Sequence, residues 1–285
     1  MMEKIKIIEC PRDAMQGIHD FIPTDQKIEH LIKLLRVGFD TIDSGSFVSP
    51  KIIPQMADTA ELMDAIKDVP HSSKLSVIVA SEGGAERAMR HDSVDILGFP
   101  FSISEQFQMD NTHKTRDQAF ETIKNIQKII ENSDKELLIY FSMAFGNPYQ
   151  DEWSVDLVKE WTARFADIGV TKINLSDTTA MAHPEDIEDL FKTLIPKYSE
   201  IEFGAHFHAE YNEWFAKIDA AYQNGCRKFD GAIKGFGGCP MAKNDLVGNT
   251  ATEKLITYAE SVKADHGLDL MAIESAYNSA MMVMG

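Results

Sequence analysis

Two histidines separated by one residue, His206 and His208, are the clearest chemical feature of the 285-residue chain. Residues two apart in an extended strand project to the same side, so both imidazoles can face one ion. An HxH pair alone is weak evidence, because most such pairs are structural or surface histidines. The carboxylate of Asp13 would complete the site if the segments that carry these residues end side by side. Two imidazoles, a carboxylate and an amide oxygen, with positions left for water or substrate, suit Mg²⁺ or Mn²⁺, and Zn²⁺ is the alternative.

Two further residues carry reactive groups whose roles the spacing leaves open. Arg12 directly precedes Asp13. It either forms a salt bridge that holds Asp13 in place or presents a permanent positive charge to a carbonyl oxygen that becomes negative. Cys239 lies between Gly238 and Pro240. It is either a small residue in a tight turn or an accessible thiol that acts as an acid in a loop over the site.

The elements that would position these residues alternate along the chain. Short apolar segments typical of β-strands recur, and apolar residues at helical spacing follow each of them. The predicted strands are residues 4–9, 39–43, 75–80, 94–98, 136–141, 171–175, 201–206 and 228–233. The predicted helices are residues 24–37, 55–66, 82–90, 119–130, 157–168, 184–195, 214–224, one that begins near 249, and 265–285. A polar loop is expected between the fourth strand and the helix that contains Ala119.

This alternation predicts a closed (β/α)₈ barrel, the TIM barrel, formed by residues 1–285 as a single catalytic domain. The series has no linker rich in proline, glycine or serine, and its length is close to the roughly 250 residues typical of such barrels. An open doubly wound sheet with helices on both faces has the same alternation and is the alternative. The last helix, 265–285, is expected to pack on the barrel.

The carboxyl ends of the barrel strands, where such folds carry their active sites, are rich in reactive groups. Arg12 and Asp13 follow the first strand, Asp43 ends the second, and Asp177 follows the sixth. The histidine pair ends the seventh strand. The eighth is followed by a long glycine-rich loop, residues 234–249, which contains Cys239.

Composition excludes several classes of protein. The 45 acidic and 28 basic residues give a formal net charge of -17, so binding to a nucleic-acid backbone is not expected. The first residues lack a long apolar run, which argues against a signal peptide or a membrane span. Three cysteines, Cys10, Cys226 and Cys239, are too few for a disulfide framework, so reduced thiols in a cytoplasm are expected.

Five sequence strings resemble the 3-hydroxy-3-methylglutaryl-CoA lyases, which belong to a wider group of metal-dependent barrel lyases and Claisen-type synthases. They are PRDAMQ (Pro11 to Gln16), SFVSPKIIPQM (Ser46 to Met56), SDTTA (Ser176 to Ala180), HFH (His206 to His208) and GGCPMAKNDLVGNTATE (Gly237 to Glu253). The resemblance runs from about Ile5 to Tyr258. The SFVSPK string and the GGCP loop are specific to the lyases, whereas HxH and RD are shared by the whole group.

The resemblance implies a carbon–carbon lyase that cleaves 3-hydroxy-3-methylglutaryl-CoA into acetyl-CoA and acetoacetate by a retro-Claisen reaction. It also implies roles for single residues. The implied metal ligands are Asp13, His206, His208 and Asn249, and the implied catalytic residues are Arg12, Asp43, Asp177, His206 and Cys239. In this scheme Arg12 steadies the enolate oxygen, Cys239 closes over the site and moves a proton, and Lys51 offers local positive charge to coenzyme A.

Four departures from the family pattern bear on the substrate. Asp43 stands where the family has Glu, Ala14 and Cys10 stand where it has Gly, and Ala209 and Glu210 replace the residues that usually follow the histidines. The alternatives are therefore a barrel aldolase or lyase for another hydroxy acid or hydroxyacyl-CoA, and a non-catalytic ligand-binding barrel. The terminal methionines, Met281, Met282 and Met284, indicate either a homodimer interface or filling of the core at the chain end.

Overall fold

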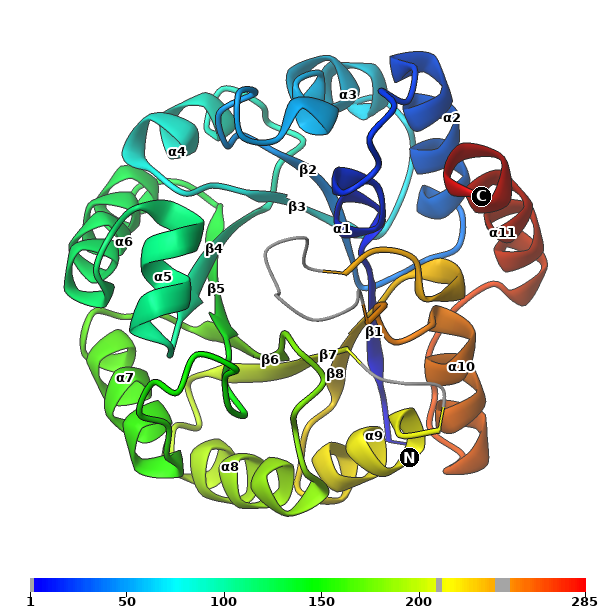
Figure 1. Cartoon of the computed structure of the whole chain (residues 1–285). Helices are drawn as coiled ribbons and strands as arrows, with labels where there is room; N and C mark the ends of the chain where they lie inside the picture. The colour runs from blue at the N-terminus through cyan, green and yellow to red at the C-terminus, as the bar shows by residue number, and fades with distance from the viewer. Residues whose placement is uncertain (1–2, 209–211, 239–246) are drawn as a thin grey trace.

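The protein is a closed barrel of parallel strands surrounded by helices (Figure 1). The computed structural model describes residues 3–208, 212–238 and 247–285. The strands are β1 (Lys6–Glu9), β2 (Thr41–Ser46), β3 (Lys74–Ile78), β4 (Ile96–Ser102), β5 (Glu136–Ser142), β6 (Lys172–Asp177), β7 (Glu202–Phe207) and β8 (Lys228–Gly231). Ile8 of β1 pairs with Thr41 of β2 on one side and with Asp230 of β8 on the other. Because β1 and β8 close the circle, the prediction of a barrel is confirmed and the open doubly wound sheet is wrong.

A ring of helices covers the outside of the barrel, and the short helix α1 lies inside that ring near the end of β1 (Figure 1). The α-helices are α1 (Pro11–Gln16), α2 (Thr24–Leu35), α3 (Thr59–Ile66), α4 (Glu82–Ala88), α5 (Glu105–Thr112), α6 (Arg116–Ile130), α7 (Val155–Asp167), α8 (Pro184–Lys197), α9 (Trp214–Gln223), α10 (Thr252–Ser261) and α11 (Leu270–Met284). The 3₁₀ turns η1 (Pro54–Met56) and η2 (Ile233–Gly235) join them.

Local sequence signals explain where these helices begin. Thr115 and Gln118 form a reciprocal capping box at the start of α6, which satisfies two of its free N–H groups. Ser154 caps α7 by accepting a hydrogen bond from Leu157 N–H at 3.1 Å. The apolar stripe of α6, which includes Ile123, is buried against the barrel, so the helical periodicity in the sequence corresponds to a packed face.

The apolar core has two parts because neighbouring residues of a strand face opposite sides. One set of strand side chains packs outward against the helices and forms the large core of the protein. The other set points into the barrel, where Ile78, Ile96, Leu138 and Tyr140 form a smaller cluster. The inward set also supplies the polar side chains of the site described below.

Two predicted boundaries are wrong in the first third of the chain. No helix was predicted between the strand at 4–9 and the helix at 24–37, but Pro11 begins the short helix α1, because the N–H that proline lacks is not needed at the first helical position. The helix expected over residues 55–66 is instead the 3₁₀ turn η1 followed by α3. The Thr59 hydroxyl donates to Met56 O at 2.8 Å and accepts from Ser46 N–H at 3.0 Å, which fixes a break between the two.

Two more predictions fail near the mouth of the barrel. The polar loop expected after the fourth strand contains α5, which Ser104 caps by accepting a hydrogen bond from Phe107 N–H at 3.1 Å. The low apolar content of α5 hides it from a search for helical periodicity. The helix expected from Asn249 begins at Thr252, because Asn249 forms an antiparallel bridge with His208.

The C-terminal helix α11 packs against α2, as Figure 1 shows, which confirms the expected packing on the barrel. Ala276 and Ala280 are fully buried at this contact, whereas Met282 is 70% exposed. Met284 packs against the core, so the terminal methionines divide between core filling and the surface. Within the described residues, no helix is long and apolar enough to cross a membrane.

Candidate metal centre and active site

A cavity of about 160 Å³ opens at the carboxyl ends of the strands. Its polar lining residues are Arg12, Asp13, Gln16, Asn111, Thr112, Ser142, Ser176, Thr178, His206 and His208. Apolar side chains, among them Val48, Ile78 and Tyr140, form much of the remaining wall. The charged groups and histidines of the lining, Arg12, Asp13, His206 and His208, thus all follow or end β1 and β7.

Asp13, His206 and His208 converge on one point of this cavity. Each offers one ligand atom, and these atoms all lie within 4.8 Å of one another. Asp13 reaches this point because α1 begins directly after β1 and turns its first residues over the barrel. Gly237, with a φ of +90°, passes so close that a Cβ atom there would lie 2.7 Å from Asp13 O.

His208 is held with one ring nitrogen bonded and the other available. Its Nδ1 lies 3.0 Å from the carbonyl oxygen of Thr178, so Nδ1 carries the hydrogen, and Nε2 is buried with no hydrogen-bond partner among the described residues. Burial lowers the pKa of His208 to about 4, with the neighbouring His206 adding to the effect. A neutral imidazole with a free Nε2 is the form that binds metal ions.

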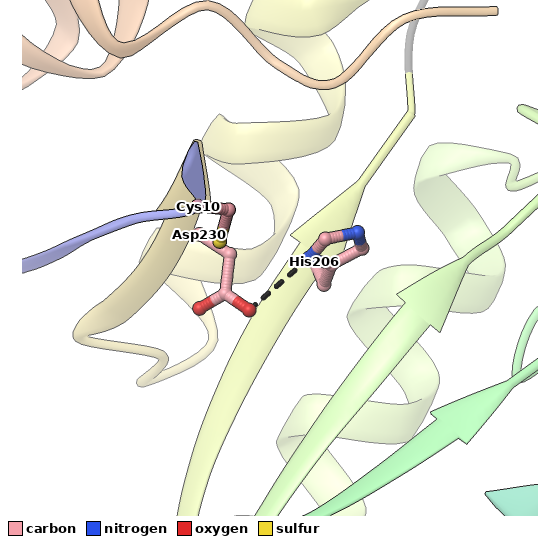
Figure 2. Close-up of side chains that lie close together, drawn as sticks. All are labelled: Cys10, His206 and Asp230. Atoms are coloured by element: carbon pink, nitrogen blue, oxygen red, sulfur yellow. Dashed lines mark hydrogen bonds and ion pairs between the residues drawn. The ribbon is translucent and has the colours of Figure 1, made fainter. Parts of the chain in front are cut away.

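His206 is held by a hydrogen bond to Asp230 of the neighbouring strand β8. His206 Nδ1 lies 3.1 Å from Asp230 Oδ2, as Figure 2 shows. Burial alone would lower the pKa of His206, but the bond to Asp230 and its negative charge raise it. A carboxylate behind a metal-binding histidine is a common support, because it fixes which nitrogen faces the ion.

Arg12 is fixed by two carboxylates and an amide. Its Nε and Nη2 donate to Asp43 Oδ2 at 2.9 and 2.5 Å, and its Nη1 donates to Asp13 Oδ1 at 3.0 Å and Gln16 Oε1 at 2.8 Å. Burial disfavours the charged form, but Asp43 and Asp13 raise the pKa of Arg12 above its ordinary value. These bonds use four of the five N–H donors, so one Nη2 hydrogen has no partner among the described residues. Arg12 therefore makes the expected salt bridges and also lines the cavity.

Asn249 lies beside the three converging residues. Thr250 N–H and the Thr250 hydroxyl donate to Phe207 O at 3.0 and 2.8 Å, which ties this segment to the end of β7. Asn249 Nδ2 donates to Asp13 Oδ2 at 2.7 Å and to Phe236 O at 2.9 Å. A ligand role needs the amide oxygen, which rotation of the amide by 180° exchanges with the nitrogen.

Asp43 and Asp177 each pair with a cation and do not line the cavity. Asp43 is fully buried and contacts Arg12, and burial raises its pKa to about 6 against the effect of Arg12. Asp177 alternates with Ser176 and Thr178, which face the cavity, so its own side chain points outward. There Asp177 Oδ2 accepts a hydrogen bond from Lys217 Nζ of α9 at 2.8 Å, and burial raises its pKa against the effect of Lys217.

The remaining predicted site residues lie at the rim of the site or outside the described residues. Lys51 is exposed in the loop after β2, directly before Ile52 and Ile53, which line the cavity. Cys239, Ala209 and Glu210 lie outside the described residues.

A second close group consists of Cys10, His206 and Asp230 (Figure 2). Cys10 and Asp230 are both buried, and burial raises the pKa of the Cys10 thiol well above its ordinary value. Asp230 already accepts hydrogen bonds from His206 and from Asn174. The group therefore consists of a neutral thiol beside a carboxylate whose oxygens are engaged.

Several residues of the site were not predicted from the sequence. Asn174 and Asp230 are inward polar residues within strands, and Glu9 is a buried outward one that accepts from Ile233 N–H at 2.8 Å and from the Thr252 hydroxyl at 2.5 Å. Burial raises the pKa of Glu9 to about 8. The available signal was a polar residue in a short strand that is otherwise apolar, because a buried polar group needs a partner.

Comparisons with known proteins identify the family. The family model described as HMGL-like matches residues 4–279. A cytoplasmic 3-hydroxy-3-methylglutaryl-CoA lyase of Rattus norvegicus is 30% identical over 275 residues, which cover 96% of this chain and 79% of the relative. A hydroxymethylglutaryl-CoA lyase of Bacillus subtilis is 28% identical over 96% of this chain and 91% of its own length.

Solved structures show the same similarity. The HMG-CoA lyase of Bacillus subtilis has a TM-score of 0.92 and 27% identity, covering 99% of this chain and 94% of its own. An HMG-CoA lyase of Acinetobacter baumannii in complex with coenzyme A and 3-methylmalate has a TM-score of 0.89 and 28% identity, covering 99% and 92%. The match over nearly the whole chain, together with the barrel and its converging residues, places this protein in the HMGL-like family, and it is a carbon–carbon lyase.

Proposed function

We propose that the protein cleaves 3-hydroxy-3-methylglutaryl-CoA to acetyl-CoA and acetoacetate in a reaction that depends on a divalent metal ion. The observation that carries this proposal is the convergence of Asp13, His206 and His208 beside Arg12 in one cavity. The names of the relatives support the substrate, and the coenzyme A bound in the Acinetobacter baumannii lyase supports a CoA thioester.

The proposed metal ligands are Asp13, His206, His208 and the amide oxygen of Asn249. The residues fit a divalent ion because His208 Nε2 is buried, neutral and without a partner among the described residues, at the point where the carboxylate of Asp13 also lies. This set of oxygen and imidazole ligands favours Mg²⁺ or Mn²⁺. When bound, such an ion lowers the pKa of the substrate hydroxyl and polarises its oxygen atoms.

The proposed reaction moves one proton and one electron pair. A base removes the proton of the 3-hydroxyl, the C2–C3 bond breaks, and C3 becomes the ketone of acetoacetate. The electron pair of the broken bond passes into the enolate of the thioester, whose oxygen Arg12 stabilises with its remaining Nη2 hydrogen. C2 then takes up a proton, which Cys239 is proposed to supply, and the base returns the hydroxyl proton to the Cys239 thiolate.

Other residues act through these groups in the proposal. Asp43 fixes the guanidinium of Arg12, and Asp177 fixes the end of β6 through Lys217, so both are positioning residues. His206 acts as a metal ligand in the proposal, because Nδ1 is bonded to Asp230 and only Nε2 is left for the cavity. Lys51, at the rim, is proposed to contact the phosphates of coenzyme A.

Three statements about the whole protein belong to the same proposal. The chain acts as one catalytic domain, and it works in the cytoplasm, where the described thiols of Cys10 and Cys226 stay reduced. It associates as a homodimer. Size-exclusion chromatography with light scattering tests the last statement.

The decisive experiment is an assay of the purified protein with Mg²⁺ or Mn²⁺ and 3-hydroxy-3-methylglutaryl-CoA. We expect acetoacetate to form only when the metal is present and to cease after chelation. No product above background from a folded, metal-loaded sample would overturn the proposed substrate. The second candidate, a differently branched hydroxyacyl-CoA, is tested in parallel, because Asp43, which bonds Arg12, is one methylene shorter than the Glu of the family.

A further inference from the structure

A chain of polar contacts crosses the interior of the barrel behind His206. Asn174 of β6 donates from Nδ2 to both carboxylate oxygens of Asp230 of β8, at 2.9 Å each. His206 of β7, the strand between them, donates from Nδ1 to Asp230 Oδ2 at 3.1 Å. The side chain of Asn174 therefore reaches past β7 to a carboxylate two strands away.

Gly204 of β7 provides the space for this reach. It is the residue in register with Asn174, two positions before His206. A Cβ atom at Gly204 would lie 2.3 Å from Asn174 Oδ1, 2.9 Å from Cγ and 3.2 Å from Nδ2. Real Cβ atoms do not approach other atoms so closely, so any other residue at 204 would displace the amide. Glycine weakens a strand interior, and its presence here matches a close approach of another group.

The contacts fix Asp230 and, through it, the ring of His206. Asn174 is fully buried and Asp230 is 2% exposed, so water does not compete for these bonds. Because Nδ1 of His206 is held by Asp230, Nε2 is the nitrogen that remains for the cavity. The carboxylate of Asp13 and the free Nε2 of His208 lie on that side.

We propose that Gly204, Asn174 and Asp230 form a positioning unit that sets the ring orientation and tautomer of His206 and thereby the affinity of the site for its divalent ion. The proposal rests on the metal site of the proposed function. It also assigns Asp230 to the support of His206 rather than to a second metal site.

The test measures the binding of Mn²⁺ to the full-length protein by isothermal titration calorimetry after chelation of bound metal. We expect the wild-type protein to bind one ion per chain. Asp230→Asn, Asn174→Ala and Gly204→Ala should each weaken Mn²⁺ binding about 10-fold to 100-fold, the usual effect of removing support from a metal ligand.

A double-mutant cycle tests whether Gly204→Ala lowers Mn²⁺ affinity through Asn174. If Gly204→Ala acts by displacing the amide of Asn174, it should have little further effect on Mn²⁺ affinity when Asn174→Ala is already present. Equal effects of Gly204→Ala in the two backgrounds would overturn the unit. Should Gly204→Ala fail to fold, unchanged Mn²⁺ affinity in both Asn174→Ala and Asp230→Asn would overturn it equally.

Gly45→Ala is the matched control for crowding in a strand. A Cβ atom at Gly45 would lie 2.6 Å from Thr59 Cγ2, away from Asp230, so this variant should lose thermal stability but keep its Mn²⁺ affinity. Circular dichroism melts report folding for every variant. Absence of Mn²⁺ binding by the wild type would refute the metal site itself, whereas two ions per chain would refute only the supporting role of Asp230.

Discussion

At the scale of single residues, the sequence motif identifies Arg12 as a reactive residue, but only the structure shows which groups it contacts. The RD pair in the sequence left two roles for Arg12, a structural salt bridge or a charge that faces substrate. The structure gives it bonds to Asp43, Asp13 and Gln16 and a place in the wall of the cavity. The three neighbours arise from α1 and β2, so their combined effect is invisible in any one segment of sequence.

Arg12→Lys tests whether the fork of the guanidinium matters beyond its charge. A lysine cannot donate to Asp43 and Asp13 at once and still leave a fixed donor for an enolate oxygen. We expect kcat to fall about 100-fold or more, while Mn²⁺ affinity changes less than about 10-fold. Arg36→Lys, which alters an exposed arginine after α2, is the control. A kcat within about threefold of the wild type would contradict the role.

The histidine pair and Asp13 were predictable as a group because strand periodicity and the order of elements fix where they meet. Asp230 was not, since nothing in the string KFDG reveals that its carboxylate faces a histidine on the neighbouring strand. Nor could the spacing show that Asp177 faces outward. One residue of register decides whether a strand side chain enters the barrel or the layer of helices.

At the scale of elements, long amphipathic segments were predictable and short polar ones were not. The helix that includes Ile123 has a clear apolar face, whereas α5 and α1 are short and owe their start to a serine cap and a proline. α9 matters to the site because Lys217 bonds both Asp177 and the carbonyl oxygen of Ala180. Outer helices thus fix the loops that carry the inner residues.

The buried His30 of α2 makes this element sensitive to acid. It is fully buried, and neither ring nitrogen has a partner among the described residues. Burial lowers the pKa of His30 to about 4, with Lys33 adding to the effect. Between the ordinary pKa of about 6.5 and this value the unfolded chain binds a proton that the folded chain does not, so stability falls as the pH falls.

Replacing His30 should remove this loss. Between pH 7.5 and pH 5 the unfolding free energy of the wild type should fall by about 2 kcal/mol because of His30. His30→Leu should lack this part of the fall. Urea unfolding at the two pH values measures the difference. His19→Asn, which removes an exposed imidazole, controls for the loss of one histidine. Parallel pH dependence in His30→Leu and the wild type would contradict the prediction.

At the scale of the whole molecule, the two ends of the barrel differ in chemistry. The carboxyl ends of the strands carry the cavity with Asp13 and the histidines. At the other end, Glu202 pairs with Lys6, Lys172 and Lys228 in one network. In barrels of this kind the first end serves catalysis and the second serves stability.

An ion bound at the carboxyl ends of the strands should therefore raise the free energy of unfolding of the whole barrel. The proposed ligands come from α1 directly after β1, from the end of β7 and from the segment after β8, so an ion would link the part of the barrel where β1 and β8 close the circle. We expect Mn²⁺ at about 100 times its Kd to add about 2.7 kcal/mol of stability, raise Tm by several degrees, and lose this effect on chelation. His208→Ala should show no shift in thermal melts with Mn²⁺. An equal shift in that variant would place the ion elsewhere.

The hydrogen bond between Asp13 and Asn249 joins residues 236 positions apart. At the usual speed of translation, a ribosome exposes Asp13 roughly tens of seconds before the histidines and Asn249 emerge. In the proposed metal site, the complete set of four ligands is therefore present only after the segment that contains Asn249 has been synthesised.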